Sequence, residues 1–326
     1  MGTAIFKELV VNGTKAKRLC TSYSQMEVYL GCPYRWYLDY LLGQRTFLKQ
    51  EALGLGTAVH KTLEQYFDTI KDGGVVTLGE AQDMMEFNMD CEEIPWSSKE
   101  AQVLAENQHM EMISGLCQGN SNLAQFMKDK EVIACERDFQ FKVDLPFEVK
   151  YGDEIYKEIY IVGSIDFIVK DKEGNIHVID FKSGKKTFAA KKLKENLQLP
   201  IYSLIIKEAY GVLPKSTQYY FTRLDEFQSV MPLANTPEEC QHIYYKNGKL
   251  KQAQRTIDEV MEEMLGIFKR QYTLGDYPPN PTALCSWCNH SPWYGDLRNC
   301  KHAQFYRRAD FKRNSNSKKI IKSIGE

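Results

Sequence analysis

The sequence predicts an α/β fold in which a mixed β-sheet is flanked by helices and preceded by a helical insertion. Between residues 131 and 224 the hydrophobic patterns run strand, strand, strand, helix, strand, which is the order of a sheet that receives a crossover helix. Residues 171–175 form a short turn with Gly and Asn between two of these strands, and this predicts a hairpin. The length of 326 residues accommodates this core together with a helical region and a terminal lobe.

The first third of the chain has helical patterns. Residues 21–42 carry an aromatic-rich stripe at helical spacing, with Ser22 as a candidate cap. Gly54 and Gly56 precede a second predicted helix, which ends near residue 73. Two amphipathic segments between residues 78 and 127, interrupted at Pro95, form the predicted helical insertion.

The strands and helices of the predicted core follow in order. Alternating or β-branched patterns predict strands at residues 131–143, 156–170 and 176–182. A helix over residues 192–210, ended by Gly211, then leads to a strand at 217–224. The last predicted helix covers residues 251–272.

The charge balance excludes a uniformly basic nucleic-acid-binding protein. The formal net charge is -1 and the pI is about 6.6, so any groove for DNA has to be a local patch. Residues 307–322 form one basic segment, which we interpret as a flexible tail. The other candidate patch consists of five lysines that follow Lys182, namely Lys185, Lys186, Lys191, Lys192 and Lys194.

Cysteine usage indicates a reducing compartment. The chain has nine cysteines, no secretory signal pattern over residues 1–30 and no apolar run long enough to span a bilayer. We therefore expect a cytoplasmic protein of a bacterial, archaeal or virus-infected cell. Cys91, Cys117 and Cys135 have no close cysteine partner in the sequence and are interpreted as small core residues.

A hard-metal site is predicted on the hairpin. Asp180 and Lys182 are two apart on a strand and therefore share one face, while Asp166 lies on the preceding strand. The hairpin brings the two carboxylates close together, where they repel each other unless a cation neutralises them, and oxygen ligands suit Mg²⁺ or Mn²⁺. A surface hairpin with an ordinary Asp–Lys ion pair is the alternative interpretation.

A soft-metal site is predicted near the C-terminus. Two residues separate Cys285 from Cys288, so both thiolates can reach one metal ion or cluster, and Cys300 is a candidate third ligand. Cys-x-x-Cys pairs often bind zinc, and His290 in the segment before Cys300 is a competing ligand.

Four ordered motifs resemble the RecB-like branch of the PD-(D/E)xK nucleases over about half of the chain. They are residues 56–60, which end in His60, the Gly163-x-x-Asp166 segment, residues 180–184 and the pair Gln198-x-x-x-Tyr202. The branch includes iron–sulfur CRISPR adaptation exonucleases and AddB-type nuclease domains. The resemblance implies a restriction-endonuclease-like core with a helical insertion and an iron–sulfur lobe formed by both termini.

The resemblance also implies roles for individual residues. His60, Asp166, Asp180 and the carbonyl of Phe181 would bind the divalent cation. Lys182 would polarise the attacking water or the scissile phosphate. Three further residues would assist at the catalytic site: Gln198 and Tyr202, which share one helix face, and Glu136, which matches an acid on the first core strand and is the weaker match.

The same resemblance implies an iron–sulfur cluster. Cys32 opens a Cys-Pro-aromatic segment that is similar to the one in iron–sulfur members of the branch. With Cys285, Cys288 and Cys300 it would ligate a structural [4Fe–4S] cluster, although the interval from Cys288 to Cys300 is longer than usual in the family. Structural Zn²⁺ remains the alternative cofactor.

These interpretations together divide the chain into five regions. Residues 1–48 form an N-terminal helical segment with one cluster cysteine, and residues 49–130 form a helical region with the motif histidine. Residues 131–235 form the nuclease core, residues 236–305 form the C-terminal helix and cysteine cluster, and residues 306–326 form the basic tail.

The expected function is that of a metal-dependent deoxyribonuclease, a phosphodiester hydrolase that acts as an exonuclease on DNA ends or single strands. The sequence has no phosphate-binding loop of the type Gly-x-x-x-x-Gly-Lys-Ser/Thr, so a separate helicase, recombination or integration protein is the expected partner. A non-catalytic DNA-binding or assembly subunit and a structure-specific endonuclease are the alternatives.

Overall fold

A computed structural model of the chain describes residues 5–45, 50–244, 246, 248, 250–293 and 297–304. The predicted basic tail therefore lies outside the described residues. The contacts divide the chain into two units. Unit 1 comprises Met1–Leu48, Phe141–Val162 and Met264–Glu326, and unit 2 comprises Lys49–Gln140 and Gly163–Glu263.

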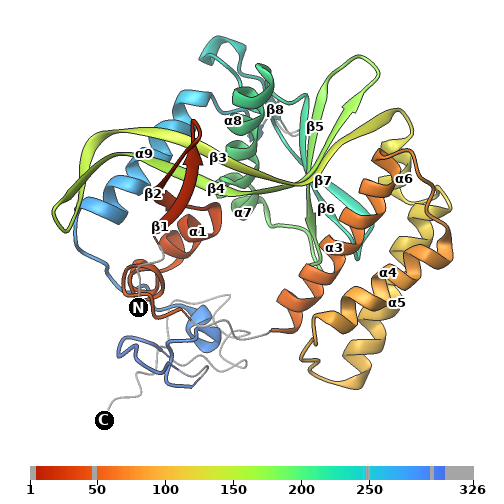
Figure 1. Cartoon of the computed structure of the whole chain (residues 1–326), viewed down its shortest axis with the longest axis horizontal. Coiled ribbons are helices and arrows are strands. Elements are labelled where there is room, and N and C mark those ends of the chain that lie inside the picture. The colour runs from red at the N-terminus through yellow and green to blue at the C-terminus, as the bar shows by residue number, and fades with distance from the viewer. Residues whose placement is uncertain are drawn as a thin grey trace. The chain divides into compact units, whose positions relative to one another are not determined.

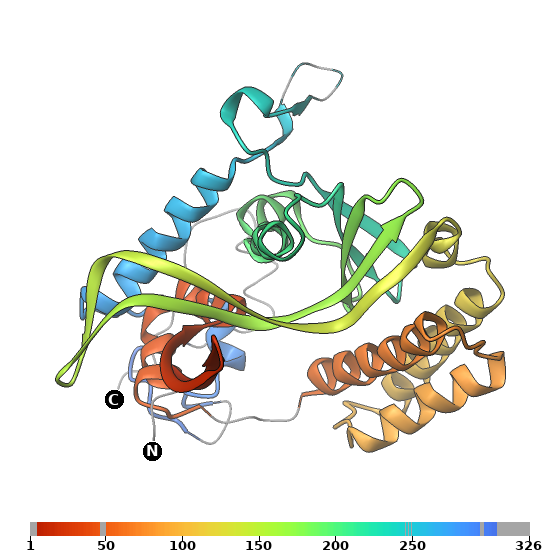
Figure 2. The same cartoon turned by 45° about the horizontal axis from the view of Figure 1, so that its top comes forward.

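Unit 2 contains the predicted mixed sheet (Figure 1). In β5, Ile179 pairs antiparallel with Phe167 of β4, and Lys182 pairs parallel with Phe221 of β6, which in turn pairs antiparallel with β7. Strand β3 pairs with β4 in a long ribbon that contributes residues to both units (Figure 2). The strands are β3 (Lys130–Tyr151), β4 (Glu154–Asp171), β5 (Ile176–Lys182), β6 (Ser216–Phe221) and β7 (Glu226–Val230).

The crossover between β5 and β6 is helical, as the sequence predicts, but it consists of two helices. Helix α7 (Ala190–Glu195) ends at Asn196, whose backbone is extended, and α8 (Gln198–Tyr210) begins two residues later. The side-chain oxygen of Asn196 accepts the backbone N–H of Gln198 at 2.8 Å and the hydroxyl of Tyr219 at 2.7 Å. Asn196 thus competes with helical hydrogen bonding and separates the predicted helix 192–210 into two.

Four helices of unit 2 precede the sheet. They are α3 (Glu51–Lys71), α4 (Leu78–Cys91), α5 (Lys99–Cys117) and α6 (Asn122–Met127), and α4 and α5 form the predicted insertion. Gly54 and Gly56 lie inside α3 and do not precede it. A Cβ atom at Gly56 would lie 3.3 Å from Ser183 Oγ, just after β5, so this glycine allows α3 to approach the end of β5 closely.

One hydrophobic core joins α3 to the sheet of unit 2. Leu63 and Phe67 of α3 belong to the same buried cluster as Phe167, Ile179 and Phe181 of β4 and β5. Full burial of a side chain of this size contributes roughly 1.5–3 kcal/mol. Cys117 and Cys135 pack against this cluster, whereas Cys91 is exposed and is not the core residue that the sequence predicted.

Unit 1 begins with a hairpin that was not among the predicted elements. Strand β1 (Phe6–Val11) pairs antiparallel with β2 (Thr14–Thr21), and Asn12 and Gly13 in the turn both have positive φ. The predicted helix 21–42 is broken at Cys32, which has extended backbone angles and precedes Pro33. It becomes α1 (Tyr23–Gly31), α2 (Pro33–Trp36) and the π-helix η1 (Tyr37–Leu41).

The last part of the described chain has one long helix. Helix α9 (Ile257–Thr273) starts six residues later than predicted, because β9 (Leu250–Ala253) pairs with β8 (His242–Tyr244). Two 3₁₀ turns, η2 (Pro237–Glu239) and η3 (Ala283–Trp287), complete the elements. Among the described residues, no helix is both long enough and apolar enough to cross a membrane.

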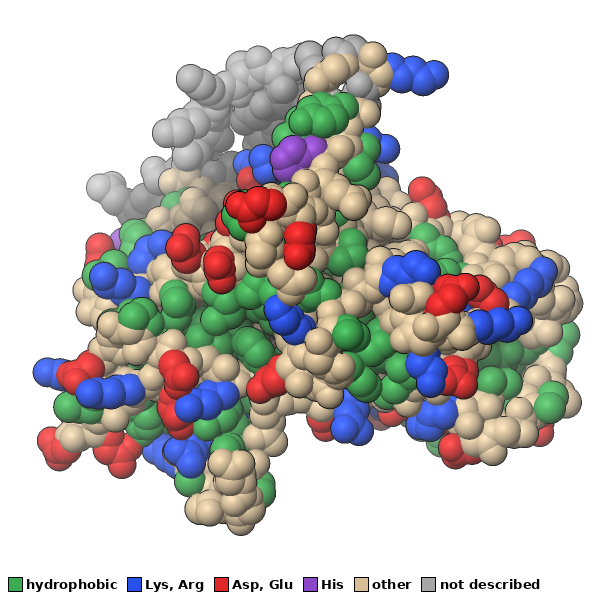
Figure 3. Space-filling model, turned by 90° about the horizontal axis from the view of Figure 1, so that it is seen from above, with side chains coloured by type: hydrophobic (Ala, Val, Ile, Leu, Met, Phe, Trp, Pro, Cys, Tyr) green, Lys and Arg blue, Asp and Glu red, His purple; other side chains and the backbone are tan. Residues whose placement is uncertain are grey.

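The surface shows why net charge alone says little about binding. On the face drawn in Figure 3, Lys and Arg side chains are interspersed with Asp and Glu side chains. A basic contact region on this face has to be a small group of side chains.

Candidate active site

The Asp–Lys pair lies at the end of β5 in unit 2. The Asp180 side chain is buried, and its Oδ2 lies 2.5 Å from the Nζ of Lys182, which is partly exposed. Ile179 and Phe181 alternate with this pair and belong to the hydrophobic core on the other face of the strand. Asp166 of β4 is also buried, and one of its carboxylate oxygens accepts the backbone N–H of Phe181 at 2.8 Å. The hairpin therefore places the two aspartates close enough for the charge of Asp180 to act on Asp166.

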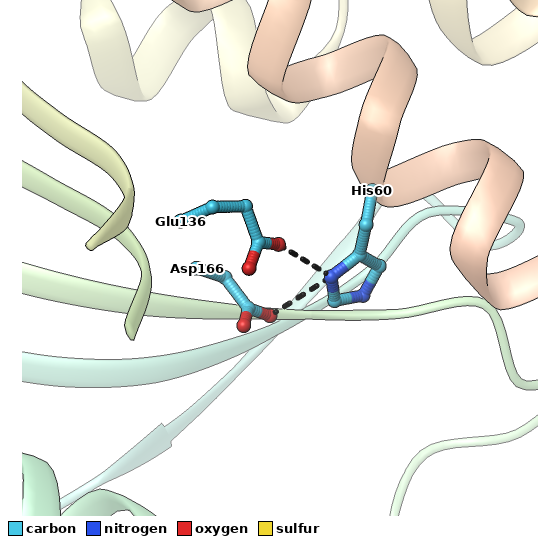
Figure 4. Close-up of side chains that lie close together, drawn as sticks. All are labelled: His60, Glu136 and Asp166. Carbon is cyan, nitrogen blue, oxygen red and sulfur yellow. Dashed lines mark hydrogen bonds and ion pairs between the residues drawn. The ribbon is translucent and has the colours of Figure 1, made fainter. Parts of the chain in front are cut away.

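His60 of α3 meets two carboxylates at this end of the hairpin (Figure 4). Its Nδ1 lies 3.0 Å from Glu136 Oε1 and 3.5 Å from Asp166 Oδ2. Among the described residues, His60, Glu136 and Asp166 form the only group whose potential metal-ligand atoms all lie within 4.8 Å of one another. One nitrogen and two carboxylate oxygens form a donor set that suits a hard divalent cation.

The two other predicted ligands, the carbonyl of Phe181 and the carboxylate of Asp180, lie near His60. The Nε2 of His60 lies 3.0 Å from the carbonyl oxygen of Phe181, which is the predicted backbone ligand. Asp180 lies outside the 4.8 Å group, but its charge acts on both His60 and Asp166. The structure thus brings all four predicted ligands into one region and adds Glu136 in direct contact with His60.

The protonation states reflect the density of carboxylates. Burial alone would lower the pKa of His60, but Asp166, Glu136 and Asp180 outweigh it and raise this pKa to about 9. Burial and the neighbouring Asp180 raise the pKa of Asp166 above its usual range. The hydrogen bond from His60 lowers the pKa of Glu136. Without a bound cation, protons have to offset part of this negative charge.

Glu136 occupies an unusual backbone conformation. Its φ of 42° places a non-glycine residue of β3 in the left-handed region, where a Cβ atom is strained. The second carboxylate oxygen of Glu136 accepts the hydroxyl of Ser164 at 3.0 Å. From the sequence, Glu136 is the weaker match because an acid at this position can equally be an ordinary surface residue.

Gln198 and Tyr202 of α8 connect the lysine to the same group. Gln198 Oε1 accepts a hydrogen bond from Lys182 Nζ at 3.1 Å, and its Nε2 donates to the Tyr202 hydroxyl at 3.2 Å. That hydroxyl donates to the carbonyl of Ser164 at 2.9 Å and lies 3.5 Å from Asp180 Oδ1. Ser164 contacts both Glu136 and Tyr202, and its position between Gly163 and Asp166 was the only sequence signal that could have identified it.

The cysteines of unit 1 form a separate group. Burial raises the pKa of Cys300, and the nearby Cys32 and Cys285 raise it further. Burial likewise raises the pKa of Cys288, and Cys300 contributes to the increase. The backbone N–H of Asn280 donates to Cys32 Sγ at 3.4 Å, so the N-terminal cysteine lies beside the C-terminal segment. The structure therefore brings the four predicted cysteines into mutual proximity.

His290 is held away from a ligand role in this arrangement. Its Nε2 lies 2.7 Å from Asp39 Oδ1 and its Nδ1 lies 2.8 Å from Asn299 Oδ1. Both ring nitrogens are thus engaged by oxygen acceptors, and neither is directed at a metal. The sequence had left His290 open as a competing ligand, and the hydrogen bonds to Asp39 and Asn299 give it a different role in joining η1 to the cysteine segment.

Comparison with known proteins identifies the family of the chain. The profile of the PD-(D/E)XK nuclease superfamily matches residues 21–293. Among solved structures, one titled "Crystal structure of SSO0001" is similar with 14% sequence identity and a TM-score of 0.28, over 82% of this chain and 92% of that chain. The superfamily match covers most of the sequence and includes every residue of the His60, Glu136 and Asp166 group. The chain belongs to the PD-(D/E)XK nuclease superfamily.

Proposed function

We propose that the protein is a divalent-metal-dependent deoxyribonuclease of the RecB-like branch, and that it cleaves phosphodiester bonds at DNA ends or in single strands. The observation that carries this proposal is the group of His60, Glu136 and Asp166 next to the Asp180–Lys182 pair. A dense group of acids and a fixed ammonium are the components that phosphodiester hydrolysis requires.

Mg²⁺ or Mn²⁺ at this group would activate water and stabilise the charge that develops on the phosphate. His60, Asp166 and Asp180 would hold the cation together with the carbonyl of Phe181. Glu136 would be a further ligand, because its carboxylate contacts His60. Asp180 and Gln198 fix the ammonium of Lys182, so this charge is positioned before DNA binds. Tyr202 supports the arrangement through its contacts with Gln198, Ser164 and Asp180.

We also propose that Cys32, Cys285, Cys288 and Cys300 hold a [4Fe–4S] cluster with a structural role. The mutual proximity of the four thiols and their origin at both ends of unit 1 support this assignment. Structural zinc at the same four thiols, with Zn–S distances of about 2.3 Å, is the alternative cofactor, and iron, sulfide and zinc analysis distinguishes the two.

The experiment is digestion of end-labelled linear and circular single-stranded DNA and of linear duplex DNA, with Mg²⁺, Mn²⁺ or EDTA. We expect metal-dependent shortening of linear substrates by the wild-type protein. Asp180→Ala and Lys182→Ala should each lower the rate by at least about 100-fold, because each removes an electrostatic contribution to the transition state. Asp83→Ala, an exposed acid on α4, is the matched control and should remain active.

The other readings correspond to distinct outcomes. Rapid cleavage of circular single strands, or of branched duplexes alone, would identify an endonuclease. Tight DNA binding without cleavage under any metal would identify a non-catalytic DNA-binding subunit. Wild-type rates in folded Asp180→Ala and Lys182→Ala would remove the active-site assignment. A requirement for a separate helicase, recombination or integration protein would appear as stimulation when that protein is added.

A further inference from the structure

The turn that follows β6 lies beside the candidate active site. Strand β6 runs parallel to β5, with Phe221 opposite Lys182, and the backbone N–H of Thr222 donates to the carbonyl of Lys182 at 3.0 Å. Arg223 is the next residue. Given the spacing between strands and the rise along a strand, its Cα lies no more than about 8 Å from that of Lys182. A side chain of arginine length can therefore reach a phosphate next to the site.

This turn is anchored at both ends. The backbone N–H of Leu224 donates to the carbonyl of Phe221 at 3.0 Å. The carboxylate of Asp225 accepts the backbone N–H of Asn122 at 2.9 Å and the hydroxyl of Tyr220 at 2.7 Å. Arg223 is therefore presented on a fixed support, which reduces the conformational entropy lost when its side chain binds a ligand.

The guanidinium of Arg223 is not neutralised within the described part of the chain. It is half-buried, its Nε has no hydrogen-bond partner there, and no described carboxylate lies within 4.0 Å of it. Glu51 is the acid whose charge acts on Arg223, and it acts on Lys185 as well. The carboxylate of Glu51 already accepts the backbone N–H of Ser97 at 3.0 Å. Glu51 thus interacts with two cations while its carboxylate also accepts a backbone hydrogen bond, and no ion pair holds the Arg223 guanidinium within the described residues.

Helix α3 relates the position of Arg223 and Lys185 to the metal-ligand group, because both cations interact with Glu51 in its first turn. Glu51 and His60 are nine residues apart on this helix, which corresponds to about 13.5 Å along its axis. Gly56, between them, allows α3 to pass close to Ser183. A strand that enters beside Glu51 and follows α3 would therefore meet Arg223 and Lys185 first and the candidate ligands afterwards.

We propose that Arg223, assisted by Lys185, binds a backbone phosphate of the DNA strand a few nucleotides away from the phosphate that is cleaved. The proposal rests on the proposed function and adds a positioning residue to it. The planar guanidinium can form two parallel hydrogen bonds to one phosphate, whereas lysine acts as a single point of charge. Contact with the backbone sets the register of the strand and does not select a base sequence.

The test compares Arg223→Ala, Arg223→Lys and the control Lys172→Ala by steady-state cleavage of single-stranded DNA at several salt concentrations. Lys172 is an exposed cation on the turn at the opposite end of β5. We expect Arg223→Ala to raise KM roughly tenfold, with kcat and Mn²⁺ affinity close to wild type, and to reduce the salt dependence of binding by about one counterion. Arg223→Lys should fall between Arg223→Ala and the wild type, and Lys172→Ala should match the wild type.

Two results would overturn the inference while leaving the nuclease proposal intact. One is an active Arg223→Ala variant whose KM and salt dependence equal those of the wild type. The other is a variant with unchanged salt dependence and a lowered melting temperature, which would mean that Arg223 only supports the packing near His109. A wild-type protein that neither cleaves nor binds DNA would remove both proposals, and the outcomes are therefore distinguishable.

Discussion

His60 carries a proton before any metal binds, because it lies among three carboxylates at the end of the hairpin. These acids raise its pKa to about 9 despite its burial. A metal ligand has to be neutral imidazole, so a cation and this proton compete for the same nitrogen. A divalent cation that binds to His60 would therefore have to displace this proton.

We therefore predict that metal binding releases a proton from His60 and strengthens with pH. Between about pH 7 and 9 the affinity for Mn²⁺ should rise, by up to about tenfold per pH unit for this proton. Calorimetric titration in two buffers of different ionisation enthalpy measures the proton count. His60→Gln should release about one proton fewer than wild type, whereas His242→Gln, on the exposed strand β8, should not. Equal proton release by wild type and His60→Gln would show that His60 is no ligand.

The backbone of Glu136 gives a second prediction for a single residue. Glycine is normally unfavourable in a strand, but at a φ of 42° it avoids the strain that any Cβ atom causes. Glu136→Gly should therefore be more stable than Glu136→Ala by about 1 kcal/mol in the metal-free protein. The neighbouring Arg137 does not have a positive φ, so there the Arg137→Ala variant should be more stable than Arg137→Gly. Urea unfolding measures both pairs. A less stable Glu136→Gly would argue against the strained conformation.

The chemical groups of the site could be predicted from the sequence, but their contacts could not. Asp166, Asp180 and Lys182 followed from strand alternation and from a hairpin with a short turn, both of which are local patterns. Glu136 contacts His60 from a position in β3 with a positive φ, and neither residue type nor spacing predicted this contact or this backbone angle. Arg223 was also missed, because its position depends on the pairing of β6 with β5.

At the level of elements, the helical insertion includes a histidine that cannot ionise without cost. His109 of α5 is fully buried, its Nδ1 donates to the carbonyl of Ala105 at 2.7 Å, and its Nε2 has no partner among the described residues. Burial lowers its pKa to about 4, and the hydrogen bond to Ala105 only partly opposes this. The helix α5 is therefore packed around a neutral imidazole.

This burial predicts how the stability of unit 2 depends on pH. An unfolded His109 has a pKa near 6.5, so below that pH the unfolded chain binds a proton that the folded chain excludes. The contribution of a neutral His109 is present above about pH 6.5 and is lost as the pH falls. From pH 7 to 5 the free energy of unfolding should decrease by about 2 kcal/mol through this group. Urea unfolding of His109→Phe should lack this decrease, and His242→Gln should retain it. An unchanged pH dependence in His109→Phe would contradict the assignment.

Helices and strands were predicted accurately where neighbouring residues alone determine them, and less accurately where distant residues do. β5 was predicted with its observed bounds, because it is rich in apolar and β-branched residues and a turn with Gly and Asn precedes it. The helix over residues 192–210 divides at Asn196 because a side chain replaces helical hydrogen bonds, which periodicity does not reveal. The Asn12-Gly13 pair is a strong hairpin signal that the prediction of the N-terminal region did not use.

On the scale of the whole molecule, each unit is assembled from segments that are distant in the sequence. Unit 1 joins three such segments, and unit 2 joins two. Within unit 1, side-chain hydrogen bonds join the first segment to the last: Asn280 to Gly31, His290 to Asp39 and Asn299 to Gln44. Local sequence patterns contain no information about such long-range pairs. Only the resemblance of the Cys32 segment to iron–sulfur nucleases indicated that the two ends meet.

The contact between the two ends of unit 1 makes the four cysteines a direct test of the proposed cluster. If one [4Fe–4S] cluster joins both ends of unit 1, loss of any single thiolate opens the same link, because Cys32 alone comes from the first segment. Anaerobically purified protein should be brown and contain iron and inorganic sulfide. Cys32→Ser, Cys285→Ser, Cys288→Ser and Cys300→Ser should each lose the colour and melt at a lower temperature. Cys91→Ser, at an exposed position on α4, is the control and should keep both properties. Colourless protein with stoichiometric zinc would replace the cluster by a zinc site, and full iron content in Cys32→Ser would show that the first segment does not supply a ligand.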